Sequence, residues 1–300
     1  MTAEKPLGNA PFRTPIPCTT MKKSAKRSSM MSCISSDALD GIVDPGPVFA
    51  TVPRGEISMT KVKICGMLTT KDVEACKGAD YCGFVVESRS RRNLKLQEAK
   101  DLMSVCSTRK VLVTTSLDPI AVLKAANVLE PDAIQVQSLM SPVDLRFLLI
   151  KTKGMVWASV QIGTGMEEKR ISSIRSVSNA ILLETKGYKM GDAWMKSDWK
   201  TCASIRDRLD PYPIILLGGL TPRNVEEAVA EVRPFAVDVS AGLETDGRKN
   251  ETLVNHFILK VKSVIEDENL VSRAEMLSEK QVNYPVSGAS GPTGSQGSQA

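Results

Sequence analysis

Aromatic side chains and histidine are scarce in this sequence of 300 residues, and long apolar runs are missing. Phe, Trp and Tyr make up only 4% of the chain, so we expect a core built from Val, Ile, Leu, Ala and Met. The single histidine, His256, argues against a zinc site and against chemistry that needs a histidine base. Without a run of 18 apolar residues we expect no membrane-spanning helix.

Cysteine usage and charge point to a class of partner. The seven cysteines are odd in number and include no C-x-x-C pair, which favours reduced thiols in a cytoplasmic enzyme. The formal net charge is +5, from 39 Lys and Arg against 34 Asp and Glu. Spread over the whole chain, this charge is too small to indicate nucleic acid binding, but it suits an anionic small molecule.

Both ends of the chain differ from its middle. Residues 1–58 hold seven of the 16 prolines and show no sustained periodicity, and residues 267–300 end in a Gly- and Ser-rich run. We expect both to be mostly disordered extensions of one domain at 59–266. The basic, Ser-rich stretch from Lys22 to Ser36 resembles a transit peptide, so organelle targeting stays open beside the alternative that the extension is dispensable.

Residues 59–266 alternate short β-branched runs with helical patterns of 9–16 residues. Eight such βα units in this length predict a (β/α)₈ TIM barrel, and a doubly wound open sheet is the alternative. The strands are expected at 61–65, 81–86, 110–114, 133–136, 155–160, 180–184, 214–217 and 236–239. The helices are expected to begin near Thr70, Leu96, Pro119, Pro142, Glu167, Asp198, Asn224 and Glu251.

Candidate site residues follow the strands, because barrel active sites lie at the carboxyl ends of the strands. Cys65 ends the first strand in K-I-C-G, where a thiol could act as nucleophile or general base; the alternative is a small buried apolar residue. After the second strand, three arginines suit a carboxylate or phosphate, unless they form a solvated basic loop. They are Arg89, Arg91 and Arg92.

The last three strands add an acid and two small-residue turns. Glu184 ends an apolar strand, where partial burial would raise its pKa and suit a proton donor; a rim carboxylate paired with Lys186 or an arginine is the alternative. The turns after the seventh and eighth strands predict a phosphate site made from backbone N–H groups, with ordinary tight turns as the alternative. Their candidate phosphate-binding residues are Gly218, Gly219, Ser240, Ala241 and Gly242.

Four motifs resemble those of the phosphoribosylanthranilate isomerase family, and the second strand is most similar to its archaeal members. They are K-V-K-I-C-G-M at 61–67, G-A-D-Y-C-G-F-V at 78–85, G-G-L-T-P-R-N-V at 218–225 and R-P-F-A-V-D-V-S-A-G-L-E-T at 233–245. The resemblance implies an Amadori rearrangement of N-(5-phosphoribosyl)anthranilate in tryptophan biosynthesis, without metal or cofactor. It also implies roles for Cys65 as general base, Glu184 as general acid, Arg92 on the anthranilate carboxylate and Asp238 near the anthranilate amine.

The sequence departs from the family pattern at three places. Glu184 stands where the family has aspartate, Gln137 stands in place of a histidine, and the Gly-rich loop after the sixth strand is replaced by a run that includes Trp194. Two alternatives therefore accompany the isomerase: a barrel for a different phosphorylated sugar, which Cys65 disfavours, and a non-catalytic binding barrel. We expect a phosphorylated small-molecule substrate and a monomer or homodimer, with no membrane partner.

Overall fold

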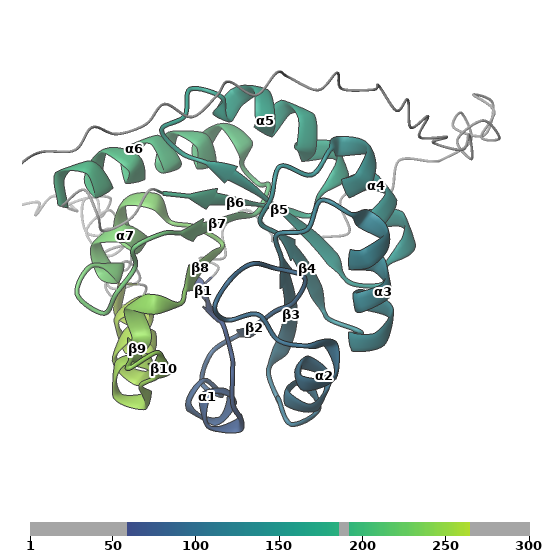
Figure 1. The fold of residues 1–300 in the computed structure, drawn as a ribbon. Helices are drawn as coiled ribbons and strands as arrows, with labels where there is room; N and C mark the ends of the chain where they lie inside the picture. Colours follow the sequence, from purple (N-terminus) through teal and green to yellow (C-terminus); the bar gives the residue numbers. More distant parts are fainter. Residues whose placement is uncertain (1–58, 186–191, 265–300) are drawn as a thin grey trace, which may run out of the picture. The chain divides into compact units, whose positions relative to one another are not determined.

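Eight parallel strands pair in sequence order and close into a barrel, because β1 pairs with both β2 and β8. The computed structural model describes residues 59–185 and 192–264. Helices surround the barrel in chain order, as the colours from purple to yellow-green show in Figure 1. The expected TIM barrel is confirmed. Its strands are β1 (Lys61–Cys65), β2 (Tyr81–Val85), β3 (Arg109–Thr114), β4 (Ala133–Val136), β5 (Met155–Gln161), β6 (Ala180–Glu184), β7 (Ile214–Leu217) and β8 (Ala236–Val239).

The helices begin where side-chain caps and proline favour a first turn. Thr69, Asp118 and Ser141 accept hydrogen bonds from the first-turn backbone of α1, α3 and α4, and proline occupies the first position of the latter two. Residues 251–264 form the closing helix. The other helices are α1 (Thr70–Ala75), α2 (Leu96–Ser104), α3 (Pro119–Leu129), α4 (Pro142–Lys151), α5 (Glu167–Ile174), α6 (Asp192–Leu209) and α7 (Val225–Val232), with the 3₁₀ turns η2 (Arg175–Val177) and η4 (Ala241–Leu243).

Two expectations about the helices were wrong. Helix α6 begins at Asp192 rather than near Asp198, so Trp194 lies in a helix and not in a loop. No glycine or proline interrupts the sequence between Gly191 and Pro211, which allows the helix to extend. Helices α1, α5 and α7 have six, eight and eight residues, shorter than the expected minimum of nine.

The core has two layers, because side chains alternate across each strand. Outward-facing residues such as Val62 and Ile64 pack against the helices. The inward-facing residues fill the barrel, where Tyr81 and Trp157 meet edge to face with ring centroids 5.2 Å apart. Two of the few aromatic residues thus occupy the centre of a core that is otherwise mostly aliphatic.

A two-stranded hairpin follows the barrel's last strand, formed by β9 (Glu244–Thr245) and β10 (Arg248–Lys249). The expected disordered extensions at 1–58 and 267–300, and the loop residues 186–191, lie outside the described residues. Within 59–185 and 192–264, no helix combines the length and the apolar character that a membrane span requires.

Candidate active site

The mouth of the barrel holds a cavity of about 410 Å³ at the carboxyl ends of the strands. Cys65, Gln137 and Asp238 line it together with the turns after β7 and β8. Glu184 ends β6, and around the barrel the strands follow in the order β6, β7, β8 and β1. The two small-residue turns therefore lie between the strand that carries Glu184 and the strand that carries Cys65.

Cys65 ends β1 on the inner face of the barrel, where it packs against the interior cluster. Its backbone carbonyl accepts a hydrogen bond from Ser240 Oγ over 2.8 Å, which ties the first strand to the turn after β8. Burial raises the pKa of the Cys65 thiol, and the positive charges of Lys63 and Lys249 oppose that rise. The thiol is thus a weak acid whose ionisation depends on the cations around it.

Asp238 is held at both carboxylate oxygens. Lys63 Nζ donates to Oδ1 over 2.8 Å, and Gln135 Nε2 donates to Oδ2 over 3.1 Å. Lys63 itself is fully buried. Burial alone would lower the pKa of Lys63, but the nearby Asp238 and Cys65 outweigh it and raise that pKa, so the side chain is an ammonium.

Glu184 is a partly buried acid with an amide partner. Gln137 Nε2 donates to Glu184 Oε1 over 3.0 Å. Burial raises the pKa of the Glu184 carboxyl, with a further contribution from the negative charge of Asp238, and the hydrogen bond from Gln137 opposes the rise. The environment therefore favours the protonated form that a proton donor needs. Lys186, considered as an alternative partner, lies outside the described residues.

The turns after β7 and β8 bring backbone close to backbone. Gly218 has a φ of +117°, and a Cβ there would come within 2.3 Å of Thr185 Oγ1. A Cβ on Gly242 would lie 1.9 Å from the carbonyl oxygen of Leu220, so the two turns touch. Only glycine fits at these two positions without a shift of the backbone, and both turns line the cavity.

Arg92 forms a two-pronged ion pair with Glu244. Its Nε donates to Oε1 over 2.8 Å and its Nη2 donates to Oε2 over 2.7 Å, while Lys249 Nζ reaches Oε1 over 2.9 Å. Burial alone would raise the pKa of Glu244, but the hydrogen bonds and charges of Arg92 and Lys249 lower it to about 2. A carboxylate of the protein thus occupies the fork of the guanidinium.

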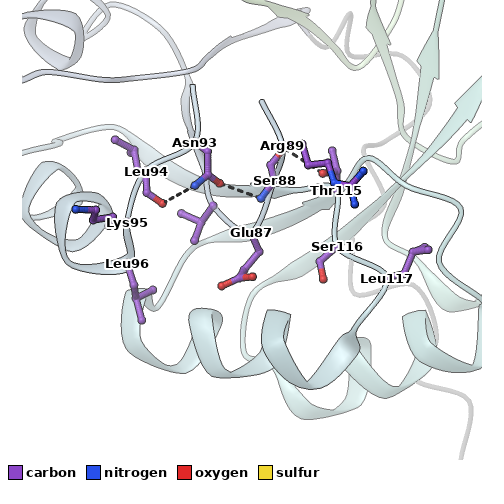
Figure 2. A pocket seen from close by; sticks show the side chains of 11 residues that line it. Glu87, Ser88, Arg89, Asn93, Leu94, Lys95, Leu96, Thr115, Ser116 and Leu117 are labelled. Atoms are coloured by element: carbon purple, nitrogen blue, oxygen red, sulfur yellow. Dashed lines mark hydrogen bonds between the residues drawn. The ribbon is translucent and has the colours of Figure 1, made fainter. Parts of the chain in front are cut away.

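The three arginines after β2 do not act as one cluster. Arg92 lies against Gly66 beside the site, whereas Arg91 is largely exposed and contacts Glu244 from outside. Arg89 lines a second cavity of about 920 Å³ between the loops after β2 and β3, shown in Figure 2. This larger cavity is lined neither by Cys65 nor by the turns after β7 and β8, so its size does not make it the candidate active site.

Sequence reasoning missed four polar residues of this region: Lys63, Gln135, Glu244 and Lys249. A signal existed for Lys63, which lies two positions before Cys65 and therefore shares its face of the strand. Gln135 has the same relation to Gln137. The pairing of Glu244 with Arg92 joins residues 152 positions apart, and no local pattern indicates it.

The fold and this arrangement define a (β/α)₈-barrel protein with its candidate active site at the carboxyl ends of the strands. The family model for N-(5′-phosphoribosyl)anthranilate isomerase matches residues 62–260. The isomerase of Methanothrix thermoacetophila is 34% identical over 211 residues, which cover 68% of this chain and 99% of the relative. The chain therefore belongs to the phosphoribosylanthranilate isomerase family, as its motifs indicated.

Solved structures agree with this assignment. The dimeric phosphoribosylanthranilate isomerase of Thermotoga maritima, solved as engineered monomers, matches with a TM-score of 0.60 and 30% identity over 68% of this chain and 100% of the other. Another isomerase of the family was solved in complex with reduced 1-(o-carboxyphenylamino)-1-deoxyribulose 5-phosphate. It matches with a TM-score of 0.59 and 28% identity over 68% of this chain and 100% of the other.

Proposed function

We propose that this chain isomerises N-(5-phosphoribosyl)anthranilate with Cys65 as general base and Glu184 as general acid. As a member of its family it is an aldose–ketose isomerase of tryptophan biosynthesis. The reaction is an Amadori rearrangement, which yields 1-(2-carboxyphenylamino)-1-deoxyribulose 5-phosphate. The substrate's own nitrogen accepts electrons during the reaction, so the proposed roles require acid–base groups only.

Each step has a group of suitable chemistry: Cys65 lines the cavity, and Glu184 is hydrogen-bonded to Gln137 of its lining. Glu184 protonates the ribose ring oxygen, and the ring opens to an iminium at C1. Cys65, as thiolate, then removes the C2 proton, and the resulting enolamine relaxes to the ketose. Asp238 lies beside Cys65 in the cavity lining and is proposed to face the anthranilate amine. Two such proton transfers are each worth typically about 10²–10⁴-fold in rate.

The phosphate and the anthranilate carboxylate are assigned to the two ends of the cavity. The backbone N–H groups of Gly218, Gly219 and Ser240–Gly242 would hold the phosphate. Arg92 would hold the anthranilate carboxylate. Glu244 already accepts hydrogen bonds from Nε and Nη2 of Arg92. The anthranilate carboxylate must therefore either accept a further hydrogen bond from Arg92 or displace Glu244 from one of these two nitrogens.

A single observation supports the proposal best. A thiol that lines the cavity and a partly buried acid that is hydrogen-bonded to the cavity residue Gln137 end strands on opposite sides of the two glycine turns, and the acid has a raised pKa. A bound phosphate in the turns would place the attached sugar between the base and the acid. A non-catalytic barrel has no need to retain this combination of groups.

The test is turnover of N-(5-phosphoribosyl)anthranilate, followed by loss of its fluorescence. The parent protein should turn over, and Cys65→Ser should not, because a hydroxyl is a far poorer base near neutral pH. Cys106→Ser, which changes a buried cysteine between α2 and β3, is the matched control and should keep activity. An inactive parent protein, or an active Cys65→Ser variant, would reject the assignment.

The assembly and location of the protein are also proposals. One relative is a dimeric enzyme, and we propose that this chain is a monomer or homodimer that works in the cytoplasm on a phosphorylated small molecule. Light scattering on the purified protein distinguishes the two states. A fluorescent fusion of the full chain tests the location, and an organellar signal would instead assign a targeting role to residues 1–58.

A further inference from the structure

The side chains of Lys63 and Cys65 both lie next to Gly83 on the inner face of the barrel. They lie two residues apart on β1, and Gly83 of β2 is the register partner of Cys65. A Cβ on Gly83 would lie 3.0 Å from Cys65 Sγ and 3.0 Å from Lys63 Nζ. The missing side chain at Gly83 therefore leaves the space in which the thiol and the ammonium approach each other.

We propose that Lys63 is a positioning residue whose ammonium stabilises the thiolate of Cys65. The proposal rests on the proposed role of Cys65 as base. In the fraction of the free enzyme whose thiol has lost its proton to solvent, the thiolate pairs with Lys63 Nζ. During turnover the thiolate takes the C2 proton of the substrate and becomes a thiol again, while Lys63 keeps its own protons throughout.

The charges around the thiol explain why one cation matters. Besides Lys63, the groups facing it are Asp238 from β8, whose negative charge disfavours the thiolate, and Lys249 from β10, which favours it. Arg92 lies over the adjacent Gly66 with its charge balanced by Glu244. Lys63 makes the strongest attraction that opposes burial, and its Nζ shares the space over Gly83 with the thiol sulfur. A thiolate in a buried position depends on such a partner.

A purely structural role is the competing explanation. Lys63 could serve only to neutralise Asp238, with which it forms a fully buried ion pair. Removing Lys63 alone would then leave a buried carboxylate without its cation, and such a variant can fail to fold. The Asp238→Asn substitution separates the two explanations. If Lys63 only neutralises Asp238, its charge no longer matters in that variant, whereas under the proposal it still stabilises the Cys65 thiolate.

The experiment compares Asp238→Asn with the double variant Lys63→Met/Asp238→Asn in the full chain. Iodoacetamide alkylation is followed between pH 6 and 10, and mass spectrometry quantifies the labelled peptide that contains Cys65. Alkylation measures the thiolate directly and needs no substrate. Lys61→Met in the Asp238→Asn background is the matched control, since Lys61 lies on the same strand but over the ring of Phe235.

Lys63→Met should slow alkylation of Cys65 at pH 7 by at least about tenfold, equivalent to a pKa rise of one unit. Lys61→Met should leave the rate unchanged. In the parent background, a folded Lys63→Met variant should lose kcat with little change in KM, and its acidic limb should move to higher pH. Equal alkylation rates with and without Lys63, or an equal effect of Lys61→Met, would overturn the proposal. If loss of Lys63 slows alkylation but the parent protein does not isomerise the substrate, the proposed function is rejected and the role of Lys63 is kept.

Discussion

Gln137 donates a hydrogen bond to Glu184, so two of the positions at which this chain departs from its family are in direct contact. The motif resemblance implies an aspartate, one methylene shorter, in place of the glutamate and a histidine in place of the glutamine. The amide of Gln137 fixes one oxygen of the longer acid, 3.0 Å from its Nε2. We therefore interpret the two departures together: the contacting pair Glu184 and Gln137 stands in place of the aspartate and histidine of the family pattern.

Glu184→Gln should lower kcat by at least about 10²-fold, the scale of a general acid. Affinity for a product analogue should change little, because the side chain keeps its size. Glu184→Asp should retain more activity than Glu184→Gln, since a carboxyl survives. Steady-state kinetics on both variants measure this, and a Glu184→Gln enzyme as fast as the parent would show that another group protonates the ring.

Gln137→Leu should move the basic limb of the kcat–pH profile to higher pH. The hydrogen bond from Gln137 lowers the pKa of Glu184, so its removal raises that pKa further. A general acid works only while protonated and loses activity as pH rises through its pKa, which gives the upward direction. Gln161→Leu, exposed at the end of the neighbouring β5, is the control and should leave the limb in place. A downward shift in Gln137→Leu contradicts the assignment.

Gly218→Ala should weaken inhibition by a phosphorylated product analogue by at least about tenfold, equivalent to 1.4 kcal/mol. The new Cβ would lie 2.3 Å from Thr185 Oγ1 and force the turn after β7 to shift. Gly165→Ala is matched to it, because Gly165 also has a positive φ, of +74°, but open space around its Cβ position. Inhibition constants for both variants provide the comparison, and equal losses would mean that backbone strain alone is responsible.

Glu244→Gln should destabilise the barrel at pH 7, and this effect should fade as pH falls through about 2. The pKa of Glu244 lies at about 2, below its ordinary value of 4.5, so its charge stabilises the fold above pH 4.5 and ceases to do so as pH falls through 2. At pH 7 the variant should melt at least about 3 °C lower, the scale of 1 kcal/mol for a domain of this size. Calorimetry across this range tests the sign, with exposed Glu231→Gln as control.

Residues 59–270 alone should fold and isomerise the substrate. All eight strands and residues 251–264 of the closing helix lie within that segment. The measurement is kcat and melting temperature against the full chain. An insoluble or inactive segment would show that residues outside it contribute to the domain.

The strands were predictable because each is a short apolar run bounded by turn residues. Strands β1, β4, β6, β7 and β8 have the expected bounds, and the others differ by one residue at one end. The start of α6 was not predictable in the same way. The family's glycine-rich loop led us to expect a loop as far as about Asp198. This sequence has no glycine or proline between Gly191 and Pro211, so the helix begins earlier, at Asp192.

The candidate site was predictable only in part, for a physical reason. Cys65, Glu184 and the glycine turns stand at strand ends, where the fold itself directs attention. Lys63 and Gln135 lie deeper in the barrel. A charged residue at an inward-facing position breaks the apolar pattern of the strand, and its role cannot be inferred until its partner is known. That partner, Asp238, is 175 positions from Lys63 along the chain.

The same long separations have a consequence for the order of folding. Ser240 to Cys65, Lys63 to Asp238, and the backbone of Lys249 to Asp72 are contacts that span 175 or more positions, and all of them cross the junction of the first and last strands. Contacts between distant positions form late, because their loops are costly to close. During synthesis no cavity for substrate exists until about residue 249 has emerged. In refolding, recovered isomerase activity would therefore lag behind the helical signal and mark the moment of ring closure.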